Sequence, residues 1–330
     1  MKYLAIALAT AALTGAQTPA ISIRPNPASL GGPDAAKSRT GVPILGYLVG
    51  PGPLELRALT GTGKAAQLGG PVALPGGVKH LYVPPRQQFV LLESNTAQSL
   101  ALWVPSKAAA ESVPLSGAMA HPDVVTFSAR GDAATLYAKG SDRLQVISGL
   151  PAEPVLTTES GLSKFGEAAG FAVSDDGLVF VAALTDGTAV VSLRGGQWQP
   201  LPAAYGARAL LFVPRTHNLA LSDPAQQTLI MLANVGEQAQ NARILAQSVS
   251  ADRLAFTKEG DVLLAASSAQ GKLWSVDLKT MTPGPVSALS IDTLLPLRDG
   301  HTFLLSSPGV SLLNVPADRD SAAGFVPVTR

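Results

Sequence analysis

Cysteine is absent from this chain of 330 residues, and charged and aromatic residues are scarce. Without cysteine the protein has no disulfides, no thiolate metal ligands and no lipid-anchored cysteine. Charged residues make up 14% of the chain and aromatic residues 5%, and so little charge argues against a disordered protein or a coiled coil. With 46% hydrophobic residues, the chain can bury one large core or two ordinary ones, and packing alone must stabilise it.

The chain also lacks a basic cluster and, beyond its amino-terminal region, an apolar run long enough to span a bilayer. It contains 24 Lys and Arg residues against 23 Asp and Glu residues. A nucleic-acid-binding protein usually concentrates an excess of basic residues on one face. We therefore expect no nucleic-acid partner and no transmembrane segment after the amino-terminal region.

Residues 1–16 have the features of a secretory signal peptide. Lys2 supplies a positive region, residues 4–13 an apolar stretch, and residues 14–16 a small-residue cleavage site. The apolar stretch is shorter than the roughly 20 residues of a membrane span, and an uncleaved anchor is the alternative. We therefore expect an exported protein, periplasmic or extracellular. Residues 17–43 are rich in Pro, Gly, Ser and Ala, a composition typical of a linker or a wrapping arm.

From residue 44 onward one pattern repeats: an apolar run, a charged turn, two more apolar runs and a weaker, more polar fourth run. The charged turns lie at Arg86, Arg130, Asp175, Arg215, Lys258 and Arg298. They recur about every 42 residues, which is typical of four-stranded propeller blades. The runs are short, are bounded by Gly, Pro, Asp or Ser, and show no sustained helical period, so the sequence predicts an all-β fold.

A seventh unit opens the repeat. Ile44–Val49 and Leu54–Leu59 match the second and third strands of a blade, but the first strand is missing from its expected place. Either Ile21–Ile23 supplies that strand after a long loop, or the blade is incomplete. We predict that residues 44–330 form a seven-bladed β-propeller of four-stranded antiparallel blades. Six blades is the alternative, if the first unit is only a decoration.

Residues 171–182 carry a resemblance to a known superfamily. Their sequence, Phe-Ala-Val-Ser-Asp-Asp-Gly-Leu-Val-Phe-Val-Ala, is similar to the inner hairpin "F-S-P-D-G-x-x-L-Y-V-A" of YVTN-type and lactonase-like propellers. Residues 256–265 and 127–138 resemble further copies. The motif's proline is replaced in all three, and the "W-D" signature of WD repeats is absent. The resemblance rests on structural positions, so it implies a propeller fold and specifies no activity.

Catalytic signatures are missing. The chain has no Gly-x-Ser-x-Gly elbow and no His-Glu-x-x-His motif. The Asp-Gly turns recur at one blade position, which indicates a structural role in tight hairpins. Trp103 and Trp274 fall in third strands and are expected to pack between blades, whereas the role of Trp198 is left open.

The candidate site lies where the chain enters the inner strands, because these positions line the top mouth of a propeller's central channel. The candidate residues are His80, His121, Asp123, Glu167, Arg208, Asp252, Arg253 and Asp292. Histidines, carboxylates and arginines that converge there could bind a metal or a small polar or anionic ligand. The alternative is a solvated polar rim with no function.

Two functions are compatible with these residues. We expect an exported, non-enzymatic scaffold that binds a protein or a polysaccharide through its top-face loops, since loops on a rigid ring commonly carry binding. The alternative is a metal-dependent, lactonase-like hydrolase in which His and carboxylates hold a divalent metal that activates water. The resemblance permits this activity without specifying its ligands, and the cofactor and oligomeric state stay open.

Overall fold

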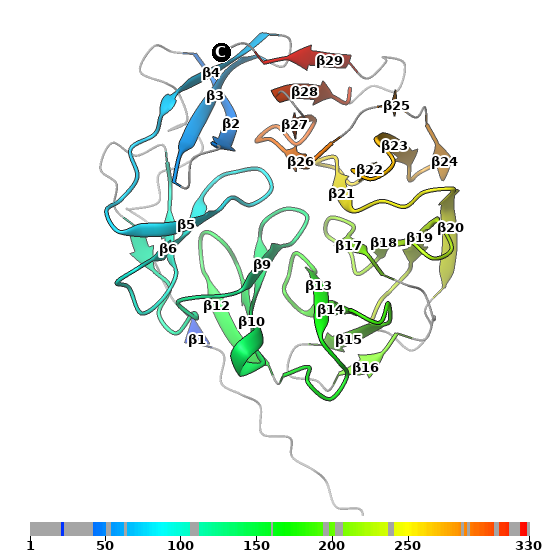
Figure 1. Cartoon of the computed structure of the whole chain (residues 1–330), viewed down its shortest axis with the longest axis horizontal. Helices are drawn as coiled ribbons and strands as arrows, with labels where there is room; N and C mark the ends of the chain where they lie inside the picture. The colour runs from blue at the N-terminus through cyan, green and yellow to red at the C-terminus, as the bar shows by residue number, and fades with distance from the viewer. Residues whose placement is uncertain are drawn as a thin grey trace, which may run out of the picture.

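The computed structural model describes residues 21–22, 42–50, 54–62, 65–105, 112–159, 161–193, 198–201, 207–236, 241–284, 287–288, 291–306, 310–316 and 324–328. In this part of the chain the strands form seven antiparallel sheets, set as blades in a ring around a central channel (Figure 1). The protein is therefore an all-β, seven-bladed β-propeller, as the repeat predicted, and the six-bladed alternative is wrong. No helix in the described ranges is long and apolar enough to cross a membrane.

The blades follow one another along the chain, and the strands of each run from the channel outward. Blade 1 contains β2 (Ile44–Val49), β3 (Leu56–Thr62) and β4 (Ala65–Pro71). Blade 2 contains β5 (Val78–Tyr82), β6 (Val90–Ser94), β7 (Ala101–Trp103) and β8 (Ser112–Pro114). Blade 3 contains β9 (Val124–Phe127), β10 (Ala133–Ala138), β11 (Arg143–Ser148) and β12 (Val155–Glu159). A 3-10 turn, η2 (Lys139–Ser141), follows β10.

Blade 4 contains β13 (Ala168–Val173), β14 (Val179–Leu184), β15 (Ala189–Leu193) and β16 (Gln199–Pro200). Blade 5 contains β17 (Ala209–Phe212), β18 (Leu219–Asp223), β19 (Thr228–Leu232) and β20 (Ala242–Gln247). Blade 6 contains β21 (Arg253–Phe256), β22 (Val262–Ser267), β23 (Lys272–Asp277), β24 (Thr282–Pro283) and β25 (Ser287–Ala288). Blade 7 contains β26 (Thr293–Pro296), β27 (Thr302–Ser306), β28 (Val310–Asn314) and β29 (Gly324–Pro327).

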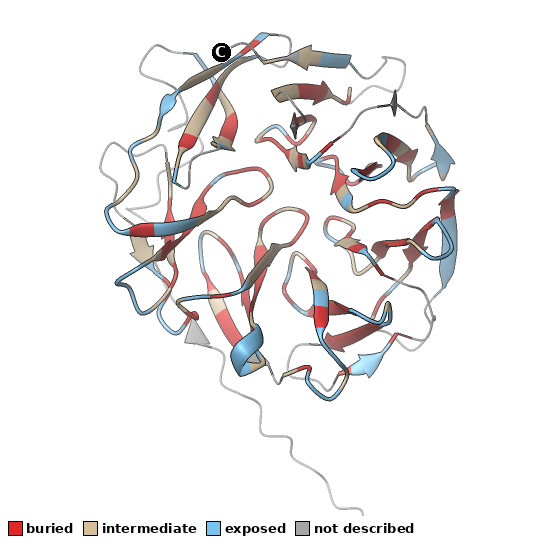
Figure 2. Ribbon diagram, viewed as in Figure 1, coloured by how far each residue is buried: buried red, intermediate tan, exposed pale blue. Residues whose placement is uncertain are grey.

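Burial follows position in the blade (Figure 2). All six residues of β14 are buried, because each blade packs between two neighbours and its inner strands are covered on both faces. On the outer strand β20, by contrast, Ile244 is 54% exposed. Trp103 and Trp274 belong to the packing between blades, as predicted. Trp198 has the same role, with its ring edge-on to Phe180 at 5.2 Å.

The charged turns form the first hairpin of blades 2 to 7 on what we call the bottom face; the top face is the one where the inner strands begin. In blade 4 the Asp176 carboxylate accepts hydrogen bonds from the Leu178 N–H at 3.0 Å and the Ser174 hydroxyl at 2.6 Å. Gly177 has φ 69°, and a Cβ there would lie 2.6 Å from the Cβ of Ser148. The Asp-Gly turn therefore has a structural role.

Hydrogen bonds join the bottom turns of different blades. Asp175 of blade 4 accepts the backbone N–H of Arg130 from blade 3 at 3.0 Å and that of Arg215 from blade 5 at 2.8 Å. The buried Arg86 of blade 2 donates to the carbonyl of Lys258 in blade 6 at 3.1 Å. Because blades 2 and 6 are not neighbours in the ring, Arg86 crosses the base of the channel.

Blade 1 has only three strands among the described residues. β2 begins at the bottom face, where the Leu45 carbonyl accepts the N–H of Arg298. β4 lies beside β29, the outer strand of blade 7. The three strands therefore occupy the second, third and fourth positions of a blade, as the sequence pattern predicted for the first two of them.

Ile21 and Ser22 of the predicted segment Ile21–Ile23 do not supply the missing strand, and Ile23 lies outside the described residues. β1 (Ile21–Ser22) pairs instead with β12 on the outer edge of blade 3, so that alternative is wrong. The bottom turn of blade 2 fills the lower half of the gap: Gln87 is fully buried and its Oε1 accepts the N–H of Tyr47. Gly46 is needed beside it, because a Cβ there would collide with Gln87 and with Leu297 of blade 7.

Candidate functional site

A pocket of ≈ 500 Å³ opens at the top mouth of the channel, where blades 1, 2 and 3 meet. Its lining residues are Val49, Lys79, His80, Leu81, Tyr82, Glu93, His121, Pro122 and Asp123. Blade 1 contributes only Val49, from the top of β2, whereas blade 2 and the β8–β9 loop contribute the polar groups. The pocket therefore combines an apolar lip with one concentrated polar wall.

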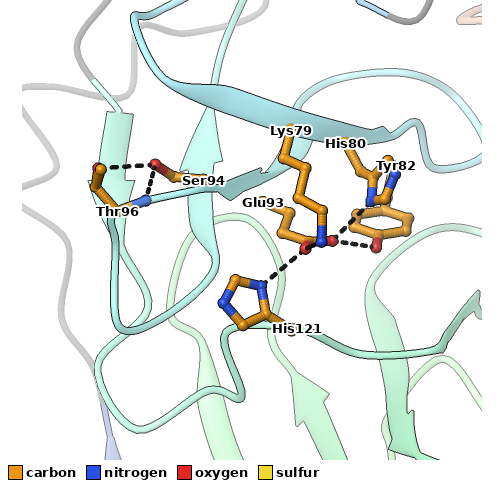
Figure 3. Close-up of polar contacts among 7 residues, drawn as sticks. All are labelled: Lys79, His80, Tyr82, Glu93, Ser94, Thr96 and His121. Atoms are coloured by element: carbon orange, nitrogen blue, oxygen red, sulfur yellow. Dashed lines mark hydrogen bonds and ion pairs between the residues drawn. The ribbon is translucent and has the colours of Figure 1, made fainter.

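Glu93 lies at the centre of the polar wall with its side chain only 2% exposed (Figure 3). Four side chains donate to its carboxylate: Lys79 Nζ at 3.0 Å, His80 Nδ1 at 3.0 Å, Tyr82 Oη at 2.8 Å and His121 Nδ1 at 2.8 Å. His80 and Tyr82 contact one oxygen, and Lys79 and His121 contact the other. A buried charge needs such partners, and Glu93 has four.

An irregularity in β5 gathers three of these donors from one strand. Residues 79 and 80 of a regular strand would point to opposite faces. The pairing of β5 with β6 shifts register between Val78 and His80, and His80 is paired directly with Glu93. A bulge places two residues against one, so Lys79 and His80 both reach the carboxylate, while Tyr82 follows on the face of His80.

The fourth donor, His121, comes from the loop between β8 and β9 and joins blade 3 to blade 2. Asp123 lies two residues further along at the start of blade 3. Its carboxylate accepts the backbone N–H of Lys139 at 2.7 Å, and its own N–H donates to the Tyr137 carbonyl at 2.8 Å. Asp123 therefore holds the loop that presents His121, and it adds a second carboxylate to the pocket lining.

The electrostatics of the wall keep Glu93 ionised. Burial opposes ionisation of this carboxyl, but the hydrogen bonds from His80, His121, Lys79 and Tyr82 outweigh it and lower the pKa of Glu93 to about 2. Burial, followed by the hydrogen bond to the Glu93 anion, raises the pKa of Tyr82, so this phenol stays protonated. Because Glu93 is a carboxylate, each histidine must carry a proton on Nδ1 to bond it.

This proton leaves the second nitrogen of each imidazole for a ligand. In a neutral imidazole with its proton on Nδ1, Nε2 is an acceptor; in the cation it is a donor. The side chains of His80 and His121 are 56% and 55% exposed, and that of Lys79 is 45% exposed. The arrangement can therefore hold a polar or anionic group at the mouth of the channel.

The structure brings three of the eight sequence-predicted residues together in this pocket: His80, His121 and Asp123. Glu167 lies apart and pairs with Lys139 at 3.1 Å, both side chains being exposed. The other four lie on blades 5 to 7: Arg208 approaches Asp252 at 4.0 Å, Arg253 donates to the Asp252 carbonyl at 2.8 Å, and Asp292 is exposed. The eight residues do not form one site.

Sequence reasoning missed Lys79, Tyr82 and Glu93. Glu93 is the next-to-last residue of the buried strand β6, where an acidic residue after the apolar run Phe89–Leu92 is unusual. The predicted hairpin around Arg86 would have placed Glu93 opposite His80, which was a signal available from the sequence. The bulge that adds Lys79 had no such signal.

A metal centre has no ligand set in the described part of the chain. No group of three or more His, Asp or Glu residues there is arranged to hold a metal ion. In the pocket itself, both Nδ1 atoms are already committed to Glu93.

Comparisons with known proteins add little to this picture. No family model matches the chain, and no curated protein matches it. Among solved structures it is similar to the Cps50 (Swd1) β-propeller domain of Myceliophteria thermophila, at 16% identity over 61% of this chain and 68% of that chain, with a TM-score of 0.46. It is also similar to the dihydro-heme d1 dehydrogenase NirN in complex with DHE, at 15% identity over 73% of this chain and 54% of that chain, with a TM-score of 0.48. Likenesses of this size say nothing about ligand or activity.

Proposed function

We propose that the protein is an exported interaction scaffold that binds an extended segment of a partner protein at its top face, in the pocket around Glu93. The observation that carries the proposal is the pocket itself, a hollow of ≈ 500 Å³ at the channel mouth with converging polar groups on one wall. Such hollows on rigid scaffolds are the usual places for binding.

The edge of β2 favours a polypeptide as the partner. Among the described residues β2 has a partner strand on one side only, β3. The Tyr47 N–H points away from β3, since it donates to Gln87. Because the pattern alternates along an antiparallel strand, the Tyr47 carbonyl and the N–H and carbonyl of Val49 point the same way.

These backbone groups lie in the upper half of the gap left in blade 1. Val49 lines the pocket and is 45% exposed. An extended polypeptide could continue the sheet there by pairing with the edge of β2, in the position that the inner strand takes in the other blades. A polysaccharide lacks the regularly spaced amides that this edge matches, so a protein segment is the better fit.

A metal-dependent hydrolase is the second function considered from the sequence. None of the described contacts favours it, since the polar groups of the pocket converge on Glu93 rather than on a shared open position. We do not propose it.

A displayed library of linear peptides tests the proposal. Peptides selected on the wild-type protein are expected to lose about tenfold or more in affinity for Val49→Pro, because proline removes the edge N–H. Ile244→Pro, on the exposed outer strand of blade 5, is the matched control and should bind them normally. Thermal unfolding of both variants checks that each is folded.

Three results would overturn the proposal. No peptide is enriched above background, the selected peptides bind Val49→Pro with the same affinity as the wild type, or Ile244→Pro lowers their affinity as much as Val49→Pro does. Binding of neutral glycans on a glycan array, with no peptide binding, would show that the partner is a polysaccharide instead.

A further inference from the structure

The histidine pair has a geometry that the proposed peptide binding does not use. Glu93 holds both imidazoles by Nδ1, at 3.0 Å for His80 and 2.8 Å for His121. The two nitrogens of an imidazole lie on opposite sides of its ring, so each Nε2 points away from Glu93. Two polar atoms that could contact a ligand are therefore fixed by one buried carboxylate, next to the half-exposed ammonium of Lys79.

The charges that face the histidines come from three elements. β5 contributes Lys79 and the protonated phenol of Tyr82, β6 contributes Glu93, and the segment after β8 contributes Asp123. β2 contributes only Val49 to the lining. Further out, Lys139 and Glu167 pair with each other and add no net charge.

The sign of the pocket's charge therefore depends on the two imidazoles. Lys79 carries one positive charge, and Glu93 and Asp123 carry one negative charge each. With both imidazoles neutral the lining has one net negative charge, and with both protonated it has one net positive charge. Protonation also turns each Nε2 from a hydrogen-bond acceptor into a donor.

We infer that this pocket recognises an anionic group, a carboxylate or a phosphate, at the ammonium of Lys79 and the exposed Nε2 of a neighbouring imidazole, and that binding takes up protons on the imidazoles. The inference rests on the proposed function, since it names the chemistry of a group that the partner presents at the same pocket. Charge and hydrogen-bond direction change together, so acidic conditions favour the anion on both counts.

Histidine nuclear magnetic resonance tests the inference, because the chain has only four histidines. Two are in the pocket; His217 and His301 lie at bottom turns, where His217 pairs with Asp176 at 2.9 Å. His80→Gln and His121→Gln assign the pocket resonances. The probes are sodium acetate and inorganic phosphate, each titrated at about pH 5.5 and about pH 8, which bracket the ordinary imidazole titration.

We expect acetate to shift the His80 and His121 resonances saturably and to leave His217 and His301 unchanged. Its apparent affinity should be about tenfold or more weaker at the higher pH. Acetate keeps one charge across this range, so its pH dependence reports on the protein. If phosphate shifts the His80 and His121 resonances and acetate does not, the group that the pocket recognises is a phosphate rather than a carboxylate. Lys79→Gln should lower the affinity for the anion about threefold or more at both pH values.

Absence of a saturable shift at His80 and His121 for both probes would overturn the inference, as would equal affinity at the two pH values. Equal shifts at His217 would identify an adventitious ion only. The two proposals are tested separately: acetate binding by the wild-type protein needs no peptide, and Val49→Pro is used only to measure peptide binding. Loss of acetate binding in the folded His80→Gln variant, with acetate still bound by the wild type, supports the inference even if no peptide binds.

Discussion

Glu93 organises the pocket although it touches little solvent. Its side chain is 2% exposed, and its carboxylate accepts hydrogen bonds from four side chains that come from β5 and from the β8–β9 loop. Removing the charge would leave these donors without their shared acceptor. The residue is therefore a positioning group, and its ionisation is coupled to folding.

The pH dependence of stability tests this coupling. The pKa of Glu93 is about 2 in the folded protein against an ordinary value of 4.5, so between these values the unfolded chain binds more protons. Stability from Glu93 is therefore present above about pH 4.5 and is lost as pH falls towards about pH 2. The loss should reach at most about 3 kcal/mol, because its partners are half-exposed.

Urea unfolding of the wild type and of Glu93→Gln over this pH range measures the loss. The variant should be less stable at neutral pH, and the difference should shrink as pH falls. Other carboxyls titrate in both proteins and cancel in the comparison. A difference that stays constant with pH would contradict the role given to the Glu93 charge.

The candidate site could be predicted only in part from the sequence, and the reason is visible at single residues. His80 and His121 were predicted because both precede an inner strand of the repeat. Lys79 was missed because alternation along β5 assigns it to the opposite face from His80, and only the bulge brings it to Glu93. Glu167 was included by its position in the repeat, yet it pairs with Lys139 on the exposed rim.

At the scale of elements, blade 1 shows how an incomplete sheet is tolerated. The strand pattern correctly placed β2 and β3 as second and third strands. It could not decide where Ile21–Ser22 would pair, because two extended residues carry no register and fit any sheet edge. The sequence also could not predict that Gln87 fills the gap, since this depends on a bottom turn in which Arg86 and Gln87 both have positive φ.

Replacing Gly46 tests the filling of this gap. In Gly46→Ala the new Cβ would collide with Gln87 and Leu297, both of which are fully buried. The variant should lower the free energy of unfolding by about 1–3 kcal/mol. Gly70→Ala in the same blade is the matched control, because nothing lies within 4 Å of a Cβ there.

Chemical denaturation measures both glycine variants. Gly70→Ala should change the free energy of unfolding by less than about 0.5 kcal/mol. Equal effects of the two substitutions would mean that Gln87 does not occupy the gap beside β2.

At the scale of the whole molecule, the ring closes between blades 7 and 1. The strands of blade 7 are consecutive in the chain, and in the described ranges none of them pairs with a strand of blade 1. The seam consists of apolar packing: Leu59 and Ala66 of blade 1 lie against Leu304 and Leu312 of blade 7. A seam without strand exchange depends on side chains and on the bonds that cross it.

Arg86 supplies such bonds from inside the channel. Arg86 is 9% exposed, and its side chain donates to the Lys258 carbonyl of blade 6, while its backbone N–H donates to the Pro296 carbonyl of blade 7 at 3.4 Å. These contacts tie blade 2 to the blades on the far side of the seam. Arg86 therefore spans the gap that blade 1 leaves incomplete.

Arg86→Met is expected to weaken the seam, because methionine keeps much of the apolar packing and loses the hydrogen bond to Lys258. The free energy of unfolding should fall by about 1–3 kcal/mol, since the Lys258 carbonyl loses a charged donor. Arg143→Met, at an exposed position on β11, is the control and should stay within about 0.5 kcal/mol of the wild type.

Hydrogen exchange in Arg86→Met should also accelerate in β2 and β26 before it does in β14, because local opening begins where the ring has the fewest stabilising contacts. Acceleration spread evenly over all blades would show that Arg86 stabilises the protein without closing the ring.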